Sequence, residues 1–142
     1  MLVSITRLRV RGWRFVPAFV VLALRSARQA KAAPGNVAVA LLAEARRTFW
    51  TRTIWVDESA MRTFMRGEPH RRAMGKLANW CDEASVVHWT QAAAAAPSWS
   101  EAWRRMQAEG RSSSVDYPTP AHANFQIAAP RLGGFGGELR LK

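Results

Sequence analysis

One predicted strand, Arg47 to Val56, most constrains the fold of this chain, because both of its faces are bulky. A strand with one solvated face alternates apolar with polar residues. Here both alternating sets carry aromatic or branched side chains: Phe49, Thr51, Thr53 and Trp55 on one face, and Trp50, Arg52, Ile54 and Val56 on the other. Both faces must therefore be covered. The sequence offers helices for only one of them, so we expect a second copy of the protein to cover the other.

The length of 142 residues predicts one domain, and such a domain buries roughly 68–70% of its unfolded surface without needing a disulfide or a metal. Cys81 is the only cysteine, so no intrachain disulfide can form. A lone cysteine is compatible with a reducing compartment. The histidines at 70, 88 and 122 have no metal-ligand spacing, so we predict no metal site.

The net charge of +11 would attract phosphate, anionic lipid or acidic ligands. Positive charge is dense from Arg7 to Lys31, a segment without acidic residues. However, nearly all basic residues are arginine and alanine is abundant, which is typical of a GC-rich coding sequence. No helix-turn-helix, zinc finger or aromatic RNA-binding pattern accompanies the charge. We therefore expect a solvated basic surface rather than a specific nucleic-acid partner.

The amino terminus resembles a targeting segment only superficially. The apolar run Phe15 to Leu24 is interrupted by Pro17, and it is about half as long as the roughly 20 residues that span a membrane. Residues 1–10 alternate like a strand, and Trp13 to Ala33 has the apolar stripe of a helix. We predict a cytoplasmic protein without a membrane span, with a peripheral membrane contact as the alternative.

The order of predicted elements defines the fold class. A second strand covers 36–45 and forms a hairpin with the two-faced strand. Asp57 then caps a helix, which breaks near Gly67 and continues from Pro69 to Trp80. A fourth strand covers 83–90. The order βαββαβ predicts an α+β, ferredoxin-like domain over residues 1–92.

Beyond residue 92 the composition changes. An alanine-rich linker leads to a predicted helix over 99–109, with Ser98 and Glu101 as a capping box and Trp99, Trp103 and Met106 on one face. This face must pack on the barrel or on a partner. The remaining residues predict a tail that is poorly ordered or extended along the surface. Its segment 133–137 is glycine-rich, but it lacks the context of a phosphate loop.

Several residues carry a resemblance to a known group of proteins. Trp55 closes the third strand, Asp57 and Glu58 open a helix, and Ala60 and Phe64 lie on its inner side. This arrangement resembles the dimeric α/β-barrel proteins of the antibiotic biosynthesis monooxygenase type. Further segments resemble a bacterial family of unknown function in that group, itself distantly similar to spheroidene monooxygenases: 6–10, 26–30, 48–50, 70–74 and 80–89. The resemblance implies a homodimer whose two four-stranded sheets form a barrel, with a pocket between each sheet and its helices.

The group includes haem-degrading enzymes, cofactor-independent oxygenases of polycyclic phenols, and proteins without known activity. At the positions of the catalytic Trp, the haem-ligating His and the Asn of the haem degraders, this chain has Phe64, Met74 and Thr6. The resemblance therefore argues against haem degradation. A haem held by His70, His88 or Met74 stays open, because imidazole and thioether are both axial ligands.

Cofactor-independent oxygenases need a dry aromatic pocket and polar groups that bind and deprotonate a phenol or enol. Trp55 matches their strand-end Trp, although core packing also explains it. By residue type we predict His88 as a base and Arg52 as an anion ligand. The predicted pocket neighbours are Phe64, Trp50 and Asn79. Cys81, beside Asp82 and Glu83, is not expected to be a reactive thiolate.

Two functions remain open from the sequence. The first is a small monooxygenase-like protein that acts on an apolar aromatic or isoprenoid substrate without a cofactor. The second is a non-catalytic dimeric barrel that binds a hydrophobic ligand or haem. No cofactor is favoured.

Overall fold

The computed structural model describes residues 1–68, 70–131 and 137–142. The predicted start of a helix at Pro69 and residues 133–136 of the glycine-rich segment lie outside these residues. One six-stranded antiparallel sheet has the order β5-β4-β1-β3-β2-β6. Its strands are β1 (Leu2–Val10), β2 (Asn36–Glu44), β3 (Thr48–Trp55), β4 (Cys81–Thr90), β5 (Arg111–Ser112) and β6 (Gly137–Arg140). The central order β4-β1-β3-β2 and the mixed α+β class confirm the ferredoxin-like prediction.

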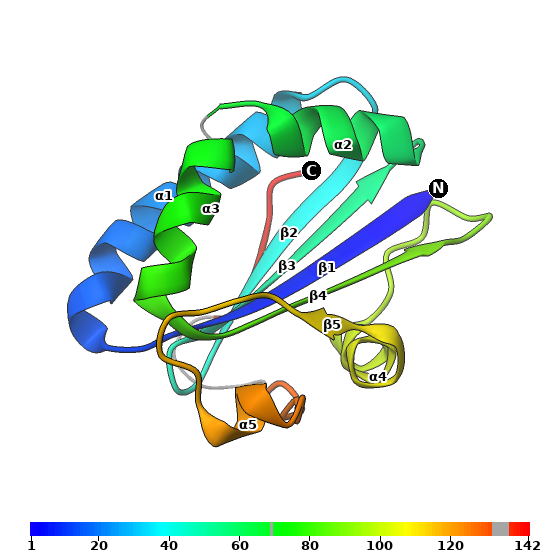
Figure 1. Cartoon of the computed structure of the whole chain (residues 1–142). Helices are drawn as coiled ribbons and strands as arrows, with labels where there is room; N and C mark the ends of the chain where they lie inside the picture. The colour runs from blue at the N-terminus through cyan, green and yellow to red at the C-terminus, as the bar shows by residue number, and fades with distance from the viewer. Residues whose placement is uncertain (69, 132–136) are drawn as a thin grey trace.

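Helices cover one face of the sheet, which we call the first face: α1 (Val16–Ala32), α2 (Glu58–Arg66) and α3 (His70–Trp80) (Figure 1). The predicted helix from Trp13 is divided, because residues Trp13–Phe15 form a 3-10 turn, η1, and Pro17 lies in the first turn of α1, where no backbone donor is needed. No helix in the described ranges is long and apolar enough to cross a membrane.

The opposite, second face is covered by the carboxy-terminal part of the same chain. Figure 1 shows α4 (Trp99–Glu109) beneath the sheet, away from α1, α2 and α3, and the short α5 (Pro120–Ala123) below the start of β4. The buried side chains that join α4 to this face form one core: Val3, Ile5, Ala40, Leu42, Trp50, Ile54, Val87, Trp89, Trp99, Ala102, Met106 and Ile127. We expected a second copy to cover this face, and this expectation is wrong because α4 of the same chain covers it. Val56, which we placed in the strand, follows its end and is exposed.

The predicted helix starts agree with the structure. The Asp57 carboxylate accepts a hydrogen bond from the Ala60 backbone N–H at 2.8 Å, and the Ser98 hydroxyl accepts one from the Glu101 N–H at 3.1 Å. Gly35 turns the chain from α1 into β2 with φ of +83°, and a Cβ atom there would lie 2.5 Å from the Ala60 Cβ atom. This turn therefore needs glycine both for its conformation and for its contact with α2.

Two short strands lie in the segment after α4, for which we predicted a tail that is poorly ordered or extended along the surface. Residue Arg111 of β5 pairs with Val86 of β4, and Leu139 of β6 pairs with Leu41 of β2. The carboxy-terminal chain thus adds a strand to each edge of the ferredoxin-like core. Residues 137–140 are extended along β2 at the surface, which is the second of the two predicted alternatives.

Candidate functional site

A cavity of about 350 Å³ lies between the first face of the sheet and helices α1, α2 and α3. Its floor carries a row of hydroxyl groups from the two central strands: Ser4, Thr6, Thr51 and Thr53. Its helical wall is mostly apolar, with Phe19, Leu22, Phe64, Met65 and Leu77 among its side chains. An apolar cavity of this size with a few polar groups has the usual character of a small-molecule site.

Aromatic rings line one part of the cavity. Trp55 is fully buried, and its indole N–H donates a hydrogen bond to the Thr53 hydroxyl at 2.9 Å. The Phe64 ring stacks on Trp55 with centroids 5.2 Å apart, and the His70 ring lies 4.8 Å from Phe64. The structure therefore brings Trp55 and Phe64 together as predicted, and it places His70 beside them.

His70 has a defined tautomer. Its Nδ1 lies 3.2 Å from the Met65 carbonyl oxygen, and a neutral ring can make this bond only by donating from Nδ1. Burial lowers the pKa of His70, partly opposed by the hydrogen bond to Met65. The ring is therefore neutral at pH 7, and Nε2 carries the lone pair.

His88 lines the same cavity from β4. Its Nε2 is buried and has no hydrogen-bond partner among the described residues. Burial lowers the pKa of His88, and the charges of Arg111 and Arg62 lower it further against the opposing effect of Glu58. A neutral imidazole whose Nε2 atom is buried and unpaired can accept a proton or a hydrogen bond from a bound molecule.

Part of the cavity wall comes from residues that we did not predict from the sequence. Arg111, Ser113, Ser114 and Val115 line it from the segment that follows α4. The ion pairs of the described chain leave Arg111 without an acidic partner. No sequence signal could have found these residues, because β5 has only two residues and shows no periodicity.

Arg52 and Trp50 lie on the second face, because neighbouring residues of a strand point to opposite faces. The Arg52 guanidinium donates to the Pro97 carbonyl at 2.8 Å and to the Glu138 carboxylate at 3.2 Å, and it lies 4.6 Å from the centroid of a Trp99 ring. It does not line the cavity. Trp50 borders the cavity along β3, but its indole N–H donates to Glu44 on the second face at 2.6 Å. The prediction that Arg52 joins Trp55 and His88 around one substrate is corrected by this geometry.

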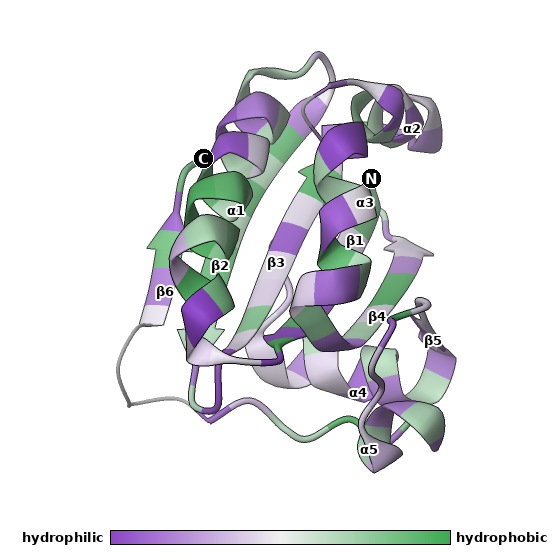
Figure 2. Cartoon of the chain, turned by 60° about the vertical axis from the view of Figure 1, so that its left-hand side comes forward, coloured by the Kyte–Doolittle hydropathy of each residue, from purple (hydrophilic) through white to green (hydrophobic). Residues whose placement is uncertain are grey.

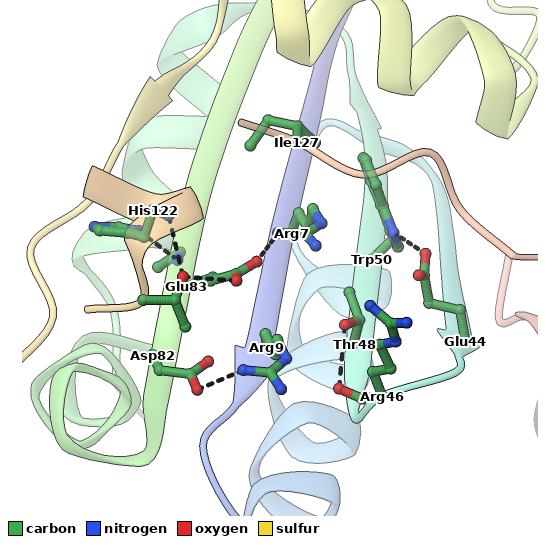
Figure 3. A network of polar contacts seen from close by, with 12 residues as sticks. Arg7, Arg9, Glu44, Arg46, Thr48, Trp50, Asp82, Glu83, His122 and Ile127 are labelled. Carbon is green, nitrogen blue, oxygen red and sulfur yellow. Dashed lines mark hydrogen bonds and ion pairs between the residues drawn. The ribbon is translucent and has the colours of Figure 1, made fainter. Parts of the chain in front are cut away.

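Figure 3 shows the polar contacts of the second face. Arg7 donates to the Glu83 carboxylate at 2.7 Å, Thr119 donates to the same carboxylate at 2.8 Å, and Arg9 pairs with Asp82 at 2.6 Å. Burial alone would raise the pKa of Glu83, but the hydrogen bonds from Arg7 and Thr119 and the charges of Arg7 and Arg9 lower it below its ordinary value. The two ion pairs join β1 to β4, and the Thr119 hydrogen bond attaches the carboxy-terminal segment to β4.

Asn79 and Cys81 lie outside the cavity. Asn79 is exposed near the end of α3, where its backbone carbonyl accepts a hydrogen bond from Arg11 at 2.6 Å, so its predicted place in the pocket is wrong. Cys81 is fully buried, and burial together with the Asp82 charge raises the pKa of its thiol to about 12. The thiol is therefore protonated and unreactive, as we predicted. No cluster of three or more metal-binding side chains occurs within the described ranges.

Known proteins resemble this chain in their three-dimensional structure. The sequence matches no family model and no curated protein. An antibiotic biosynthesis monooxygenase of known structure superimposes with a TM-score of 0.59 at 16% identity, covering 66% of this chain and 100% of that one. The protein shares the fold of the antibiotic biosynthesis monooxygenase-like proteins.

Two further structures show the same relation. SnoaB, a cofactor-independent oxygenase from Streptomyces nogalater, matches with a TM-score of 0.55 at 19% identity, covering 65% of this chain and 93% of its own. A conserved protein from Methanosarcina mazei matches with a TM-score of 0.57 at 14% identity, covering 64% of this chain and 92% of its own. About a third of this chain thus has no counterpart in these structures.

Proposed function

We propose that this protein is a small monooxygenase-like enzyme that oxidises an apolar aromatic or isoprenoid substrate in the cavity of the first face, without a bound cofactor. The observation that carries the proposal is the buried, unpartnered Nε2 of His88 in an apolar cavity beside Trp55 and Phe64. A buried polar atom without a partner costs free energy unless a ligand satisfies it. The fold shared with SnoaB, a cofactor-independent oxygenase, supports the same reaction class.

The chemistry follows from the residues present. A substrate with a CH₂ group activated by a phenol or enol loses one proton to His88 Nε2 and becomes a carbanion. Oxygen takes electrons from the carbanion and bonds to its carbon as a peroxide, which is then protonated. Loss of water from this hydroperoxide leaves a carbonyl, so CH₂ and O₂ become C=O and H₂O. The aromatic wall excludes bulk water, and Trp55 and Phe64 give the ring system a flat contact surface.

Arg111 is the residue that we expect to bind the negative charge of the deprotonated substrate. Deprotonation leaves a negative charge that spreads to the phenol or enol oxygen, and Arg111 is the arginine that lines the cavity. A guanidinium forms strong, charge-assisted hydrogen bonds with such an oxygen. We assign to Arg111 the anion-binding role that the sequence suggested for Arg52.

Oxygen consumption with a polycyclic phenol that carries an activated CH₂ group tests the proposal. We expect the purified protein to consume one O₂ per product formed and His88→Asn to lose roughly 100-fold or more in kcat, the usual contribution of a general base. His122→Asn is the matched control. Its ring lies outside the cavity, and its Nδ1 accepts a hydrogen bond from the Ala84 N–H at 3.3 Å, which an asparagine oxygen can replace.

Equal activity of His88→Asn and His122→Asn would contradict the role of His88. Absence of turnover across a panel of phenolic and isoprenoid probes, together with tight binding of one of them, would instead favour the second candidate function.

That second candidate is a non-catalytic protein that binds a hydrophobic ligand or haem in the same cavity. His70 favours it, because its Nε2 lone pair is available beside Phe64 and suits an axial ligand role. The visible absorbance of the purified protein separates the two functions. A bound chromophore that His70→Ala removes and His122→Asn retains would support this candidate and exclude the cofactor-independent reaction.

The homodimer and the cytoplasmic location remain predictions. If a second copy binds, it must use a surface other than the one that α4 covers, because the core of the second face is complete within one chain.

A further inference from the structure

The outer face of α1 is apolar in its first half and basic in its second. Its exposed positions follow helical spacing, so Pro17, Ala18, Val21, Arg25 and Arg28 lie on one side of the helix. The exposed Trp13 and Arg14 of η1 precede them. We call these seven residues the α1 surface. In Figure 2, the first half of α1 is mostly green (hydrophobic), and purple (hydrophilic) bands occur in its second half.

The apolar part of the α1 surface is exposed to solvent. Trp13 is 71% exposed and Val21 is 51% exposed, although most large apolar side chains of the first half of the chain are covered. Arg47 lies with its guanidinium carbon 5.7 Å from the centroid of a Trp13 ring, and its Nε donates to the Val10 carbonyl at 2.9 Å. The indole therefore lies beside an arginine that is fixed by the β2–β3 turn.

The charge of the α1 surface is not neutralised. No acidic residue precedes Glu44 in the sequence, and none of the ion pairs between described residues includes Arg14, Arg25 or Arg28. By contrast, Arg7 and Arg9 are paired with Glu83 and Asp82 on the other side of the sheet. The partner of this surface must therefore bring negative charge together with an apolar layer.

We propose that the α1 surface binds the surface of an anionic lipid bilayer, with Trp13, Pro17 and Val21 entering the headgroup region and Arg14, Arg25 and Arg28 contacting lipid phosphates. Tryptophan is favoured at the boundary between headgroups and acyl chains. Each nearby arginine strengthens attraction to an anionic surface. Because the inner face of α1 packs on the sheet through Phe19, Ala27 and Ala30, the helix contacts the bilayer from outside and binds it reversibly.

Other partners fit less well. A nucleic acid would use the arginines but leave Pro17, Ala18 and Val21 in water, where they contribute nothing. A second copy related by a twofold axis would bring the arginines of both copies together, and their like charges would repel each other. A bilayer satisfies both parts of the surface.

Co-sedimentation with vesicles tests the proposal. We expect the full chain to bind vesicles of phosphatidylcholine mixed with phosphatidylglycerol, to bind phosphatidylcholine alone much less, and to dissociate at high salt. The double variant R25Q/R28Q should lose about thirtyfold in affinity. Its control R71Q/R104Q removes the same charge from exposed positions on α3 and α4 and should bind normally.

A second pair of variants isolates the apolar contribution. Val21→Ser should weaken binding by about fivefold. Leu139→Ser, at a residue that is 49% exposed on β6, should not. Equal losses in R25Q/R28Q and R71Q/R104Q would overturn the proposal, because net charge alone would then explain binding. Oligonucleotide binding that depends on Arg25 and Arg28 without vesicle binding, or a dimer that Val21→Ser dissociates, would overturn it in favour of those partners.

Discussion

The two cavity histidines make the stability of the fold depend on pH. Burial lowers the pKa of both His70 and His88 below the ordinary value of 6.5. The unfolded chain therefore binds protons more readily than the folded chain as the pH falls through 6.5, so acid favours unfolding. We expect the free energy of unfolding to be highest above this value and to fall between it and the lowered pKa values.

Urea denaturation at several pH values measures this effect. The double variant H70Q/H88N should have a flatter pH profile than the wild type through this range. A slope that is unchanged in H70Q/H88N would show that other groups control acid stability.

Arg111 gives a second prediction at the residue scale, and it depends on the proposed oxygenase reaction. Arg111→Gln should lower kcat/KM for a phenolic probe by about tenfold or more, since a charge-assisted hydrogen bond to the deprotonated substrate contributes roughly 1.5–3 kcal/mol. Steady-state kinetics with Arg104→Gln as the control checks the effect. An Arg111→Gln variant with the same kcat/KM as Arg104→Gln would show that Arg111 does not bind the deprotonated substrate.

The alternating pattern of β3 assigned its residues to the correct faces of the sheet. Trp55 and Thr53 share one face, and Trp50 and Arg52 share the other, in both the sequence pattern and the structure. Arg52 was assigned to the site by its chemical type, against this pattern. Arg111 could not be predicted at all, because its place depends on how a two-residue strand pairs with β4.

At the scale of elements, the ion pair of Arg7 and Glu83 joins β1 and β4 to the carboxy-terminal segment through Thr119. Arg7 is 4% exposed, so removing the negative charge leaves a buried guanidinium unpaired. Glu83→Gln keeps the shape of the side chain but removes its charge, and it should lower the free energy of unfolding by about 3 kcal/mol.

Chemical denaturation measures this cost. Glu58→Gln, which breaks the exposed pair with Arg62 at 2.7 Å, should cost only about 0.5 kcal/mol. Similar losses in both variants would show that burial adds little to the Arg7 and Glu83 pair.

The turn between α1 and β2 gives a further prediction for the arrangement of elements. Gly35→Ala would force an L-residue into φ of +83° and bring its Cβ atom against Ala60 at 2.5 Å. We expect a loss of about 2 kcal/mol or more in unfolding free energy, because both the backbone and the start of α2 must shift. Gly75→Ala on α3, where a Cβ atom meets nothing within 4 Å, should be neutral or stabilising. Equal effects of the two substitutions would contradict the close contact.

Local signals predicted the elements well because their causes are local. Asp57 and Ser98 cap helices with their own side chains, and the apolar residues of α4 define which of its faces is buried. By contrast, the surface on which α4 packs cannot be predicted from local sequence. Trp99 and Met106 show that the helix packs on something, but only the folded chain shows that this is the second face of its own sheet.

At the scale of the whole molecule, the second face determines how copies can associate. Its strands contribute Ile5, Leu42, Trp50, Ile54 and Val87 to the core under α4. If residues 93–142 are removed, these side chains become an exposed apolar patch, and Glu83, the partner of Arg7, loses its hydrogen bond from Thr119. Large exposed apolar patches promote association. The shortened chain should therefore dimerise or aggregate, even though it retains the ferredoxin-like core.

Light scattering during size exclusion distinguishes this association from any dimer of the full chain. We expect the mass of the chain 1–92 to increase with concentration, and we expect Trp50→Glu in that background to reduce association, because Trp50 lies at the centre of the exposed face. Val21→Ser, on the opposite side of the molecule, is the control and should leave it unchanged. A chain 1–92 that stays folded and monomeric would show that α4 covers a face without affinity for a second copy.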